Sequence, residues 1–409
     1  MNIWLISAFE PTPVDNTRPM RFMGIADAAI ALGHKVTFFT TTFKHGNKTQ
    51  RYHQHTYHTV IPGSYELVFL HSKPYKGNIT VERMLAHRDL AKKLLAEVQT
   101  RTDKPDIIYI SLPPLSTVQV ICKWAKEHNI PVVVDIIDPW PAVFLKAFPT
   151  PVKGAGKILL SPFYKKLSYI LNNCAAVTAI SKQYTDWTAT FYNKPRPTAY
   201  FYPAIQFAEV KEAFKALADT TPKPTDKLRI IYAGSLASSY DIPTILGAAA
   251  IIEQKYPGKT EFLIAGTGTQ EDLVKAKEKE LPNIKYLGWL GQDEINTQFY
   301  LADIGLTQHV PGATQSVTYK LFDYLGAGLP ILNSLVSEMA AIIEDNKVGF
   351  NNISGDPASL AQNVERFLTD PSLLPAYKSN ALKLTAEQGD AQVVYSKLVH
   401  FIEQFAAKN

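Results

Sequence analysis

The sequence predicts an α/β protein built from two doubly wound parallel sheets. Short apolar runs alternate with longer amphipathic stretches, which is the pattern of strands that alternate with helices. The alternation restarts after a polar, proline-broken segment near the middle of the chain. A length of 409 residues suits two or three domains, and a hydrophobic content of 46% excludes a largely disordered chain.

The first half contains five predicted strands, each short and apolar as in a sheet covered on both faces. They run from Asn2 to Ala8, Lys35 to Thr40, Asp106 to Ser111, Pro131 to Ile137 and Ala175 to Ser181. Residues 21–32 and 116–128 have helical spacing between these strands. The order strand, helix, strand predicts parallel pairing.

The second half repeats this organisation. Its predicted strands run from Leu228 to Ala233, Phe262 to Ala265, Asp303 to Thr307 and Pro330 to Asn333. A tail helix is expected over 390–406. We therefore expect a first domain over 1–205, a linker over 206–227, a second domain over 228–385, and a final segment, 386–409, whose helix packs back on the first domain.

Ligands of doubly wound sheets bind beyond the carboxyl ends of the strands. Two such domains with their loops facing each other form a cleft, so loops that follow strands are the places to search for a site.

The most informative loop follows the predicted strand 303–307. It is rich in Gly, Ser and Thr and leads into a helix expected over about 317–325. Lys320 falls in the first turn, where a cation is unfavourable unless an anion such as phosphate compensates it. Asp323 lies three residues on, on the same face. The alternative is a surface helix with a Lys–Asp pair and no ligand.

This segment reads Thr-Tyr-Lys-Leu-Phe-Asp-Tyr-Leu-Gly-Ala-Gly-Leu-Pro from Thr318 onward. It resembles the donor-binding signature of glycosyltransferase family 4, in its capsule and O-antigen branch. The resemblance implies the GT-B fold, with two Rossmann-like domains that face a cleft and a C-terminal helix that crosses back to the first domain. It also implies sugar transfer from a nucleotide diphosphate donor with retention of anomeric configuration.

Many members of the family carry two glutamates separated by seven residues, and Gln315 and Asp323 occupy these positions here. The resemblance implies that Asp323 holds the ribose, that Gln315 reads the donor sugar, and that Lys320 acts on the diphosphate. Ser316 and Thr318 fall in the same donor-binding segment. The change from Glu to Gln places the identity of the sugar in question more than the reaction class.

Further donor-binding residues are implied in the loops after the second domain's first strands. Gly234 and Ser235 follow its first strand, and their backbone N–H groups are expected to share the phosphate load with Lys320. Tyr240 stands where the family commonly has Lys. The other expected contacts are Gly266 and Gly268, in a tight turn, and Trp289, in a segment that resembles the one meeting the base.

Acceptor-side residues are expected in the first domain. Asp138 follows a buried strand in Asp-Ile-Ile-Asp-Pro-Trp-Pro, and it is our candidate for orienting or deprotonating the acceptor. Its alternative role is a turn before Pro139. Arg18 and Arg21 are expected to face the cleft, where either supplies positive charge, with Arg21 counted among the catalytic candidates. The alternative for Arg18 is a solvated loop charge.

The charge distribution points to a membrane surface. A net charge of +5 is too small to predict nucleic-acid binding. Between Asp138 and Asp186, however, there is no acidic residue, and lysines at 146, 153, 157, 165, 166 and 182 alternate with aromatic and aliphatic residues. This pattern suits an anionic inner-membrane surface. The alternative is a core-packing helix with a solvated lysine face.

We expect a cytoplasmic protein that binds peripherally to the inner face of the plasma membrane. The chain has two cysteines, Cys122 and Cys174, which suit a reducing compartment. Its start lacks the features of a signal peptide, and no apolar run of membrane-spanning length occurs.

These observations favour a transferase that needs neither metal nor cofactor. The sequence contains no Asp-x-Asp pair of the kind that holds a metal and a diphosphate. The resemblance implies a nucleotide-sugar donor, expected to be UDP-linked, and a polyprenyl-diphosphate-linked saccharide acceptor. The charge pattern adds the anionic membrane as a partner. The product is a hexosyl or N-acetylhexosaminyl linkage in a surface polysaccharide. Two alternatives stay open, a UDP-sugar 2-epimerase on the same fold and a non-catalytic scaffold of a polysaccharide assembly complex.

Overall fold

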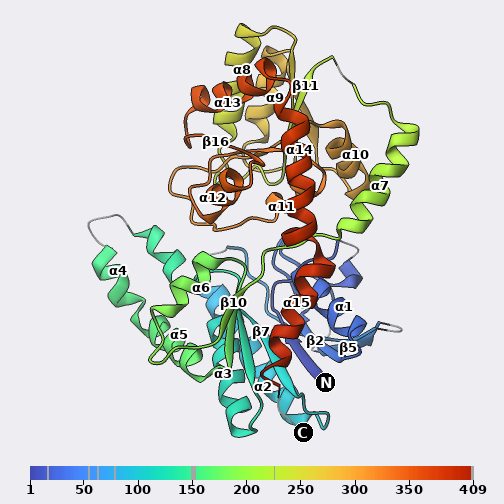
Figure 1. Cartoon of the computed structure of the whole chain (residues 1–409). Coiled ribbons are helices and arrows are strands. Elements are labelled where there is room, and N and C mark those ends of the chain that lie inside the picture. Colours follow the sequence, from blue (N-terminus) through green and yellow to red (C-terminus); the bar gives the residue numbers. More distant parts are fainter. Residues whose placement is uncertain are drawn as a thin grey trace. The chain divides into compact units, whose positions relative to one another are not determined.

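The computed structural model describes residues 1–15, 18–53, 56–61, 64–77, 80–148, 153–224 and 226–406. The chain divides into two compact units, each with one main sheet. Unit 1 comprises Met1–Tyr202 together with the segment from Val394 onward, and unit 2 comprises Pro203–Val393. Each unit is described by itself below (Figure 1).

Unit 1 contains an eight-stranded sheet in the order β10-β9-β8-β7-β1-β2-β6-β5. All neighbouring strands pair in parallel except β5 and β6, which pair antiparallel at one edge. Its strands are β1 (Asn2–Ile6), β2 (Lys35–Thr41), β5 (Thr56–Val60), β6 (Glu66–Leu70), β7 (Ile107–Leu112), β8 (Val132–Ile136), β9 (Ala176–Ala179) and β10 (Thr198–Tyr200). A small hairpin pairs β3 (Phe43–Lys44) with β4 (Thr49–Gln50).

The helices of unit 1 cover this sheet. They are α1 (Arg21–Ala31), α2 (Val81–Thr100), α3 (Leu115–Glu127), α4 (Lys153–Leu159), α5 (Ser161–Asn173), α6 (Lys182–Ala189) and, after Val393, most of α15 (Ala391–Glu403). Strands β1, β7, β8 and β9 are almost entirely buried because helices cover both faces, which is why they read as continuous apolar runs. Neither the edge strand β5 nor its inner neighbour β6 was predicted. The pattern of β5 alternates intermediate and exposed residues and is weakly apolar.

Unit 2 contains a six-stranded, entirely parallel sheet in the order β13-β12-β11-β14-β15-β16. Its strands are β11 (Leu228–Ala233), β12 (Thr260–Ala265), β13 (Ile284–Gly288), β14 (Ile304–Thr307), β15 (Ile331–Asn333) and β16 (Gly349–Asn351). Its helices are α7 (Phe207–Thr220), α8 (Ile242–Lys255), α9 (Glu271–Glu280), α10 (Gln292–Leu301), α11 (Lys320–Gly326), α12 (Glu338–Asp345), α13 (Pro357–Thr369) and α14 (Leu373–Leu384). Strand order reverses between β11 and β14, so the switch point lies beside the loop that leads into α11.

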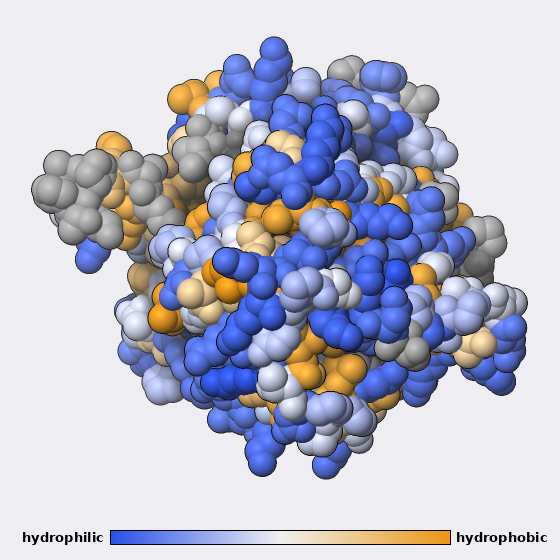
Figure 2. Space-filling view, turned by 90° about the horizontal axis from the view of Figure 1, so that it is seen from above, coloured by the Kyte–Doolittle hydropathy of each residue, from blue (hydrophilic) through white to orange (hydrophobic). Residues whose placement is uncertain are grey.

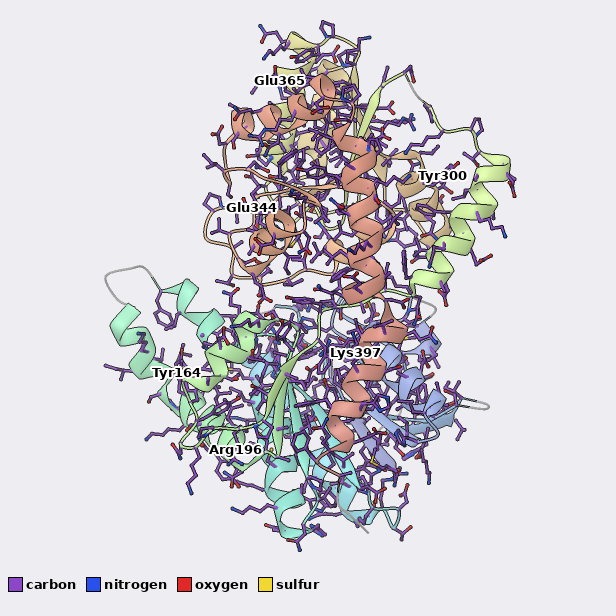
Figure 3. All side chains as sticks on the ribbon, in the orientation of Figure 1. Tyr164, Arg196, Tyr300, Glu344, Glu365 and Lys397 are labelled. Carbon is purple, nitrogen blue, oxygen red and sulfur yellow. The ribbon has the colours of Figure 1, made fainter. Side chains whose placement is uncertain are left out.

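The predicted linker is not a free linker over its whole length. Residues 207–220 form helix α7, which belongs to unit 2 and packs on α10. Val210, Phe214 and Leu217 recur at helical spacing, and the Phe214 ring lies 5.6 Å from the ring of Tyr300, which Figure 3 labels on α10. The proline-broken residues after α7 lead directly into β11. The apolar face formed by Val210, Phe214 and Leu217 therefore makes this segment a packed helix, although its polar composition suggested a linker.

The tail helix α15 contacts the first helix of unit 1. A Cβ atom at Gly24 would lie 2.5 Å from the ring of Tyr395, so the glycine permits close approach of α1 and α15. The Glu403 carboxylate lies 2.6 Å from His34 Nε2. These contacts attach the end of the described chain to unit 1.

An ion pair in the core of unit 1 joins α1 to the sheet. Arg21 Nε donates to Asp135 Oδ2 at 2.7 Å, and Nη2 donates to Asp135 Oδ1 at 2.9 Å. Both side chains are fully buried. Thr178 also donates to Asp135, and Arg21 donates to the carbonyl of Phe201, so the pair is enclosed by hydrogen bonds.

Arg21 was predicted to be an acceptor-side charge that faces a cleft, and the structure corrects this. The guanidinium points into the core because Asp135, on the neighbouring buried strand β8, offers a bidentate carboxylate. Its role is structural in this arrangement, since Asp135 and the carbonyl of Phe201 use donors that a ligand would need.

Removing one partner of this pair should strongly destabilise the protein. We expect Arg21→Met to lower the free energy of unfolding by about 3–5 kcal/mol, because it leaves the Asp135 carboxylate buried without its cation. Urea unfolding measures the change. The matched control is Lys182→Met, which breaks an exposed pair with Asp186 and should cost less than about 0.5 kcal/mol. An equal effect of the two changes would contradict the assignment.

Candidate functional site

The candidate donor site lies at the carboxyl edge of the unit 2 sheet. Three loops that leave adjacent strands are joined there by backbone hydrogen bonds. Gly234 N–H donates to the Ala265 carbonyl, Gly266 N–H donates to the Gly288 carbonyl, and Leu236 N–H donates to the Thr267 carbonyl. The loops after β11, β12 and β13 therefore form one connected rim.

Glycines make this close packing possible. Gly266 has a φ of 133°, and a Cβ atom there would lie 1.8 Å from the Gly234 carbonyl oxygen. Gly268 has a φ of 156°, and its Cβ atom would clash with the Leu236 backbone. A side chain at either position would separate the loops.

Gly234 has a different role from the predicted one. Its N–H group was expected to face phosphate, but it donates to the Ala265 carbonyl at 2.9 Å and is already used. What Gly234 provides is space, since a Cβ atom there would lie 2.6 Å from Lys320 Nζ. Ser235 is exposed beside it and accepts the Tyr232 hydroxyl through its carbonyl.

Lys320 is the most unusual side chain of the site. Its Nζ atom is buried and has no hydrogen-bond partner among the described residues. It lies 4.0 Å from the centre of the Tyr232 ring and 4.4 Å from that of Tyr240. Two electron-rich ring faces stabilise the cation where no anion does so directly. We call Lys320, Tyr232 and Tyr240 the lysine box.

Burial lowers the pKa of Lys320 to about 7, and the nearby Asp323 carboxylate counteracts this in part. His309 closes one side of the box, with its ring 5.2 Å from that of Tyr240. Burial and the charge of Lys320 lower the pKa of His309 to about 4, so it is neutral near pH 7. The lysine box therefore holds an amine whose charge depends on what binds near it.

The loop before α11 contributes further polar atoms without partners. Gln315 Oε1 and Ser316 Oγ are buried and form no hydrogen bond within the described residues. Buried polar atoms are nearly always satisfied in proteins, so three of them in one loop and its helix, Lys320 included, are typical of a ligand site. Thr318 is half-buried in the same loop and donates to the sulfur of Met339.

Helix α11 begins at Lys320, three residues later than predicted, and has seven residues. So short a helix offers little dipole at its N-terminus for an anion. Asp323 is half-buried one turn further along the helix. Trp289 follows β13 and is 74% exposed, a position in which its indole ring is accessible to a base.

The candidate acceptor residues lie in unit 1. Asp138 follows β8, as predicted, and its side chain is exposed. Enough protein surrounds the carboxylate that desolvation still raises its pKa to about 6, while the Arg83 guanidinium acts in the opposite direction. Arg18 is half-buried in the loop before α1 and has interaction partners in the structure.

An arginine that was not predicted lies near Asp138. Arg83 is buried on α2, and its guanidinium carbon lies 4.8 Å from the Trp140 ring and 5.2 Å from that of Phe9. Burial together with the charge of Arg83 lowers the pKa of His87 to about 3, so His87 is neutral and accepts from Arg83 Nε at 3.4 Å. Since Arg83 lies in an amphipathic helix far from the motif, no local signal marked it.

Glu10, in the loop after β1, was also missed. Its Oε2 atom is buried without a partner in the described chain, and desolvation raises its pKa to about 7. Its place after the first strand could have marked it, because Asp138 and Gly234 also follow a strand.

The fold places this chain among the GT-B proteins, which consist of two Rossmann-like units. Sucrose-phosphate synthase from Thermosynechococcus elongatus superposes with a TM-score of 0.73 at 15% identity, over 99% of this chain and 98% of that one. HepE from Anabaena, solved with UDP-glucose, superposes with a TM-score of 0.64 at 13% identity, over 99% and 100% of the two chains. These likenesses confirm the predicted fold class.

The chain belongs to glycosyltransferase family 4. Residues 21–208 match the Glycosyltransferase Family 4 profile, and residues 227–370 match the profile of Glycosyl transferases group 1. The amylovoran biosynthesis glycosyltransferase AmsK of Erwinia amylovora is 25% identical over 186 residues, which is 44% of this chain and 45% of that protein. The chitobiosyldiphosphodolichol beta-mannosyltransferase of Candida glabrata is 24% identical over 258 residues, 57% and 55% of the two proteins.

The chain thus matches about half the length of these curated relatives. The matched profiles and relatives are glycosyltransferases, the class of enzyme that the sequence predicts.

The lysine box makes nucleotide binding depend on pH. With a pKa of about 7 in the free protein, Lys320 loses its charge as the pH rises, whereas a bound diphosphate raises that pKa. Binding of UDP above neutrality therefore takes up a proton, and we expect affinity to fall by up to about tenfold per pH unit between pH ~7.5 and ~9. Calorimetric titration at several pH values measures this.

Lys320→Met should bind UDP weakly and without this pH dependence, whereas Lys285→Met, an exposed lysine on β13, should behave like the parent protein. Equal pH profiles for the parent protein and Lys320→Met would show that the amine does not meet the diphosphate.

Proposed function

We propose that this protein is a retaining glycosyltransferase that moves a hexosyl or N-acetylhexosaminyl group from a UDP-sugar to a polyprenyl-diphosphate-linked saccharide, in the synthesis of a surface polysaccharide. The observation that carries the proposal is the lysine box, whose buried amine has no hydrogen-bonded anion and lies near two polar side chains that are also without partners in the described chain. A diphosphate supplies the missing negative charge, and a sugar supplies hydroxyls for Gln315 and Ser316.

The roles follow from the chemistry of the groups. Lys320 stabilises the negative charge that develops on the leaving diphosphate. Asp323 holds the ribose hydroxyls, and Gln315 reads the sugar. Trp289 stacks its ring on the base. Gly266 and Gly268 shape the tight turn after β12 that lines the nucleotide site. On the acceptor side, Asp138 accepts the proton of the attacking hydroxyl, because a pKa of about 6 leaves it ionised yet basic near pH 7.

Similar proteins support the donor and the pathway. HepE binds UDP-glucose, and AmsK acts in amylovoran biosynthesis. The Candida glabrata relative acts on a diphosphodolichol-linked saccharide, which supports a polyprenyl-linked acceptor. We propose that the reaction needs no metal and no cofactor, since Lys320 is the cation that faces the leaving group.

Incubation of a UDP-sugar with a lipid-linked saccharide tests the function. We expect transfer with retained anomeric configuration, unaffected by EDTA, and no change of the donor when acceptor is omitted. Conversion of the donor alone would indicate the epimerase, and no turnover with any acceptor would indicate the scaffold.

Three variants connect this reaction to the site. Lys320→Ala and Asp323→Ala should each lower kcat/KM by about 10²-fold or more, because each removes an interaction with the donor. Asp138→Asn should remove the fall in kcat/KM that the parent protein shows below pH about 6, when Asp138 becomes protonated. An unchanged acid limb in that variant would assign the proton transfer to another group.

We also propose that unit 1 binds an anionic membrane surface. Lys157 and Lys165 are exposed on α4 and α5, next to the exposed side chains of Ile158 and Leu159. The side chains of Lys146 and Lys153 lie outside the described residues. Lys182 pairs with Asp186, so it adds less positive charge. In the part of the chain that the structure describes, every helix is too short or too polar to cross a bilayer.

Reversal of two charges tests the membrane proposal. We expect Lys157→Glu combined with Lys165→Glu to weaken binding to phosphatidylglycerol vesicles by about tenfold or more, since each basic residue near the surface contributes about 1 kcal/mol. Vesicle flotation measures binding. The double reversal of Lys285 and Lys194, two exposed lysines elsewhere, is the control. Unchanged binding of the first variant would remove the membrane from the proposal.

A further inference from the structure

A cavity of about 320 Å³ lies in unit 1 between α2, α3 and α5. This volume is at the lower end of the range for small-molecule sites. Apolar side chains form most of its wall, namely Met84, Leu115, Trp140, Pro162 and Phe163. We call this cavity the α2–α5 groove. It is a feature of unit 1 alone, and neither the donor chemistry nor the motifs account for it.

Two cations and no carboxylate line the α2–α5 groove within the described residues. Arg88 comes from α2 and Lys166 from α5. Neither forms an ion pair in the described part of the chain, although Asp89 on the same helix pairs with Lys93. An apolar wall with unpaired positive charges fits a ligand that joins a hydrocarbon chain to an anionic group.

Exposed apolar side chains continue from the groove. Helix α4 runs directly into α5, and its Ile158 and Leu159 are 76% and 68% exposed. Val81 and Leu85 are exposed on the first turns of α2. Figure 1 shows α4 extending away from the sheet of unit 1, and in Figure 2 the corresponding projection carries hydrophobic residues. A hydrocarbon chain that extends out of the groove would therefore contact further apolar surface.

The groove also adjoins the candidate acceptor residue. Trp140 forms part of its wall, and the same short loop carries Asp138. The guanidinium of Arg83 lies against the Trp140 ring, and the His87 ring lies 5.8 Å from it. The apolar wall, the cations and the acceptor carboxylate are thus neighbours within one unit.

We infer that the α2–α5 groove binds the isoprenoid chain next to the diphosphate of the acceptor, with Arg88 and Lys166 facing that diphosphate. This inference rests on the proposed function and names the part of unit 1 that holds the acceptor's lipid. Burial of isoprene units against Leu115, Trp140 and Phe163 supplies binding free energy from apolar area. The two cations fix the position of the diphosphate and so present the attached saccharide near Asp138.

Direct binding tests the inference without any turnover. Farnesyl diphosphate, a short isoprenoid, is titrated into the full chain by calorimetry, with inorganic diphosphate, farnesol and a linear alkyl diphosphate of equal length as comparisons. We expect farnesyl diphosphate to bind at least about tenfold more tightly than each of them. Only this compound combines a branched isoprenoid chain for the apolar wall with a diphosphate for the cations. Equal binding of the linear compound would overturn the isoprenoid assignment. Equal binding of inorganic diphosphate would overturn the claim that the groove binds a hydrocarbon chain.

Variants of the two cations and of the apolar wall test whether farnesyl diphosphate binds in the α2–α5 groove. Arg88→Glu combined with Lys166→Glu should weaken farnesyl diphosphate binding by about tenfold or more, since each charge-assisted contact contributes strongly. Phe163→Ala and Ser116→Trp, which enlarge and fill the groove, should also weaken it. Lys194→Glu is the matched charge reversal elsewhere in unit 1 and should change nothing. Unaltered affinity for farnesyl diphosphate in both the charge-reversal variant and the wall variants would contradict the assignment.

Kinetics separates this inference from the proposed function. The groove variants should raise KM for a polyprenyl-linked acceptor and leave KM unchanged for the donor and for a water-soluble saccharide acceptor. If sugar is transferred but the groove variants leave every KM unchanged, the groove assignment is wrong and the function stands. If farnesyl diphosphate binds and its affinity falls in the variants, yet no sugar is transferred, the function is wrong and the groove stands.

Discussion

The proposed donor site depends on a buried amine that has no hydrogen-bonded anion. Lys320 Nζ lies between the rings of Tyr232 and Tyr240 and over Gly234, which leaves room for it because it lacks a Cβ atom. Burial disfavours the charged amine and lowers the pKa of Lys320 to about 7, while the nearby Asp323 carboxylate acts in the opposite direction. A folded protein that retains such a group has a place for a negative charge, which is why a diphosphate ligand explains the surrounding unsatisfied atoms.

Each unit uses the carboxyl edge of its sheet in a different way. In unit 2 this edge is a rim of closely packed loops, which glycines hold together and which surrounds the lysine box. In unit 1 the corresponding edge carries Asp138, with Arg83 and Trp140 beside it, and the α2–α5 groove continues from there. Arg21, which was predicted as a catalytic residue, instead holds α1 against β8 through Asp135. Of the charged residues in unit 1, Arg21 and Asp135 thus stabilise the fold, whereas Asp138 is the candidate for acceptor chemistry.

Much of the fold could be predicted because buried parallel strands are continuous apolar runs, and nine such runs reappear as strands. The edge strand β5 and helix α7 were not predicted, since partial burial weakens their apolar patterns. The loop with Gln315, Lys320 and Asp323 could be found from its motif. The tyrosine rings around Lys320, the pairing of Arg21 and the position of Arg83 could not, because each depends on contacts between segments that are distant in the sequence.

The most direct measurement is the pKa of Lys320 by NMR of side-chain-labelled lysines, with and without UDP. The spectrum of Lys320→Met identifies the signal. The account predicts a pKa of about 7 in the free protein and a clear rise when UDP binds, because the bound diphosphate supplies the missing negative charge. An ordinary lysine pKa in both states, or no change on binding, would contradict the claim that this amine receives the diphosphate.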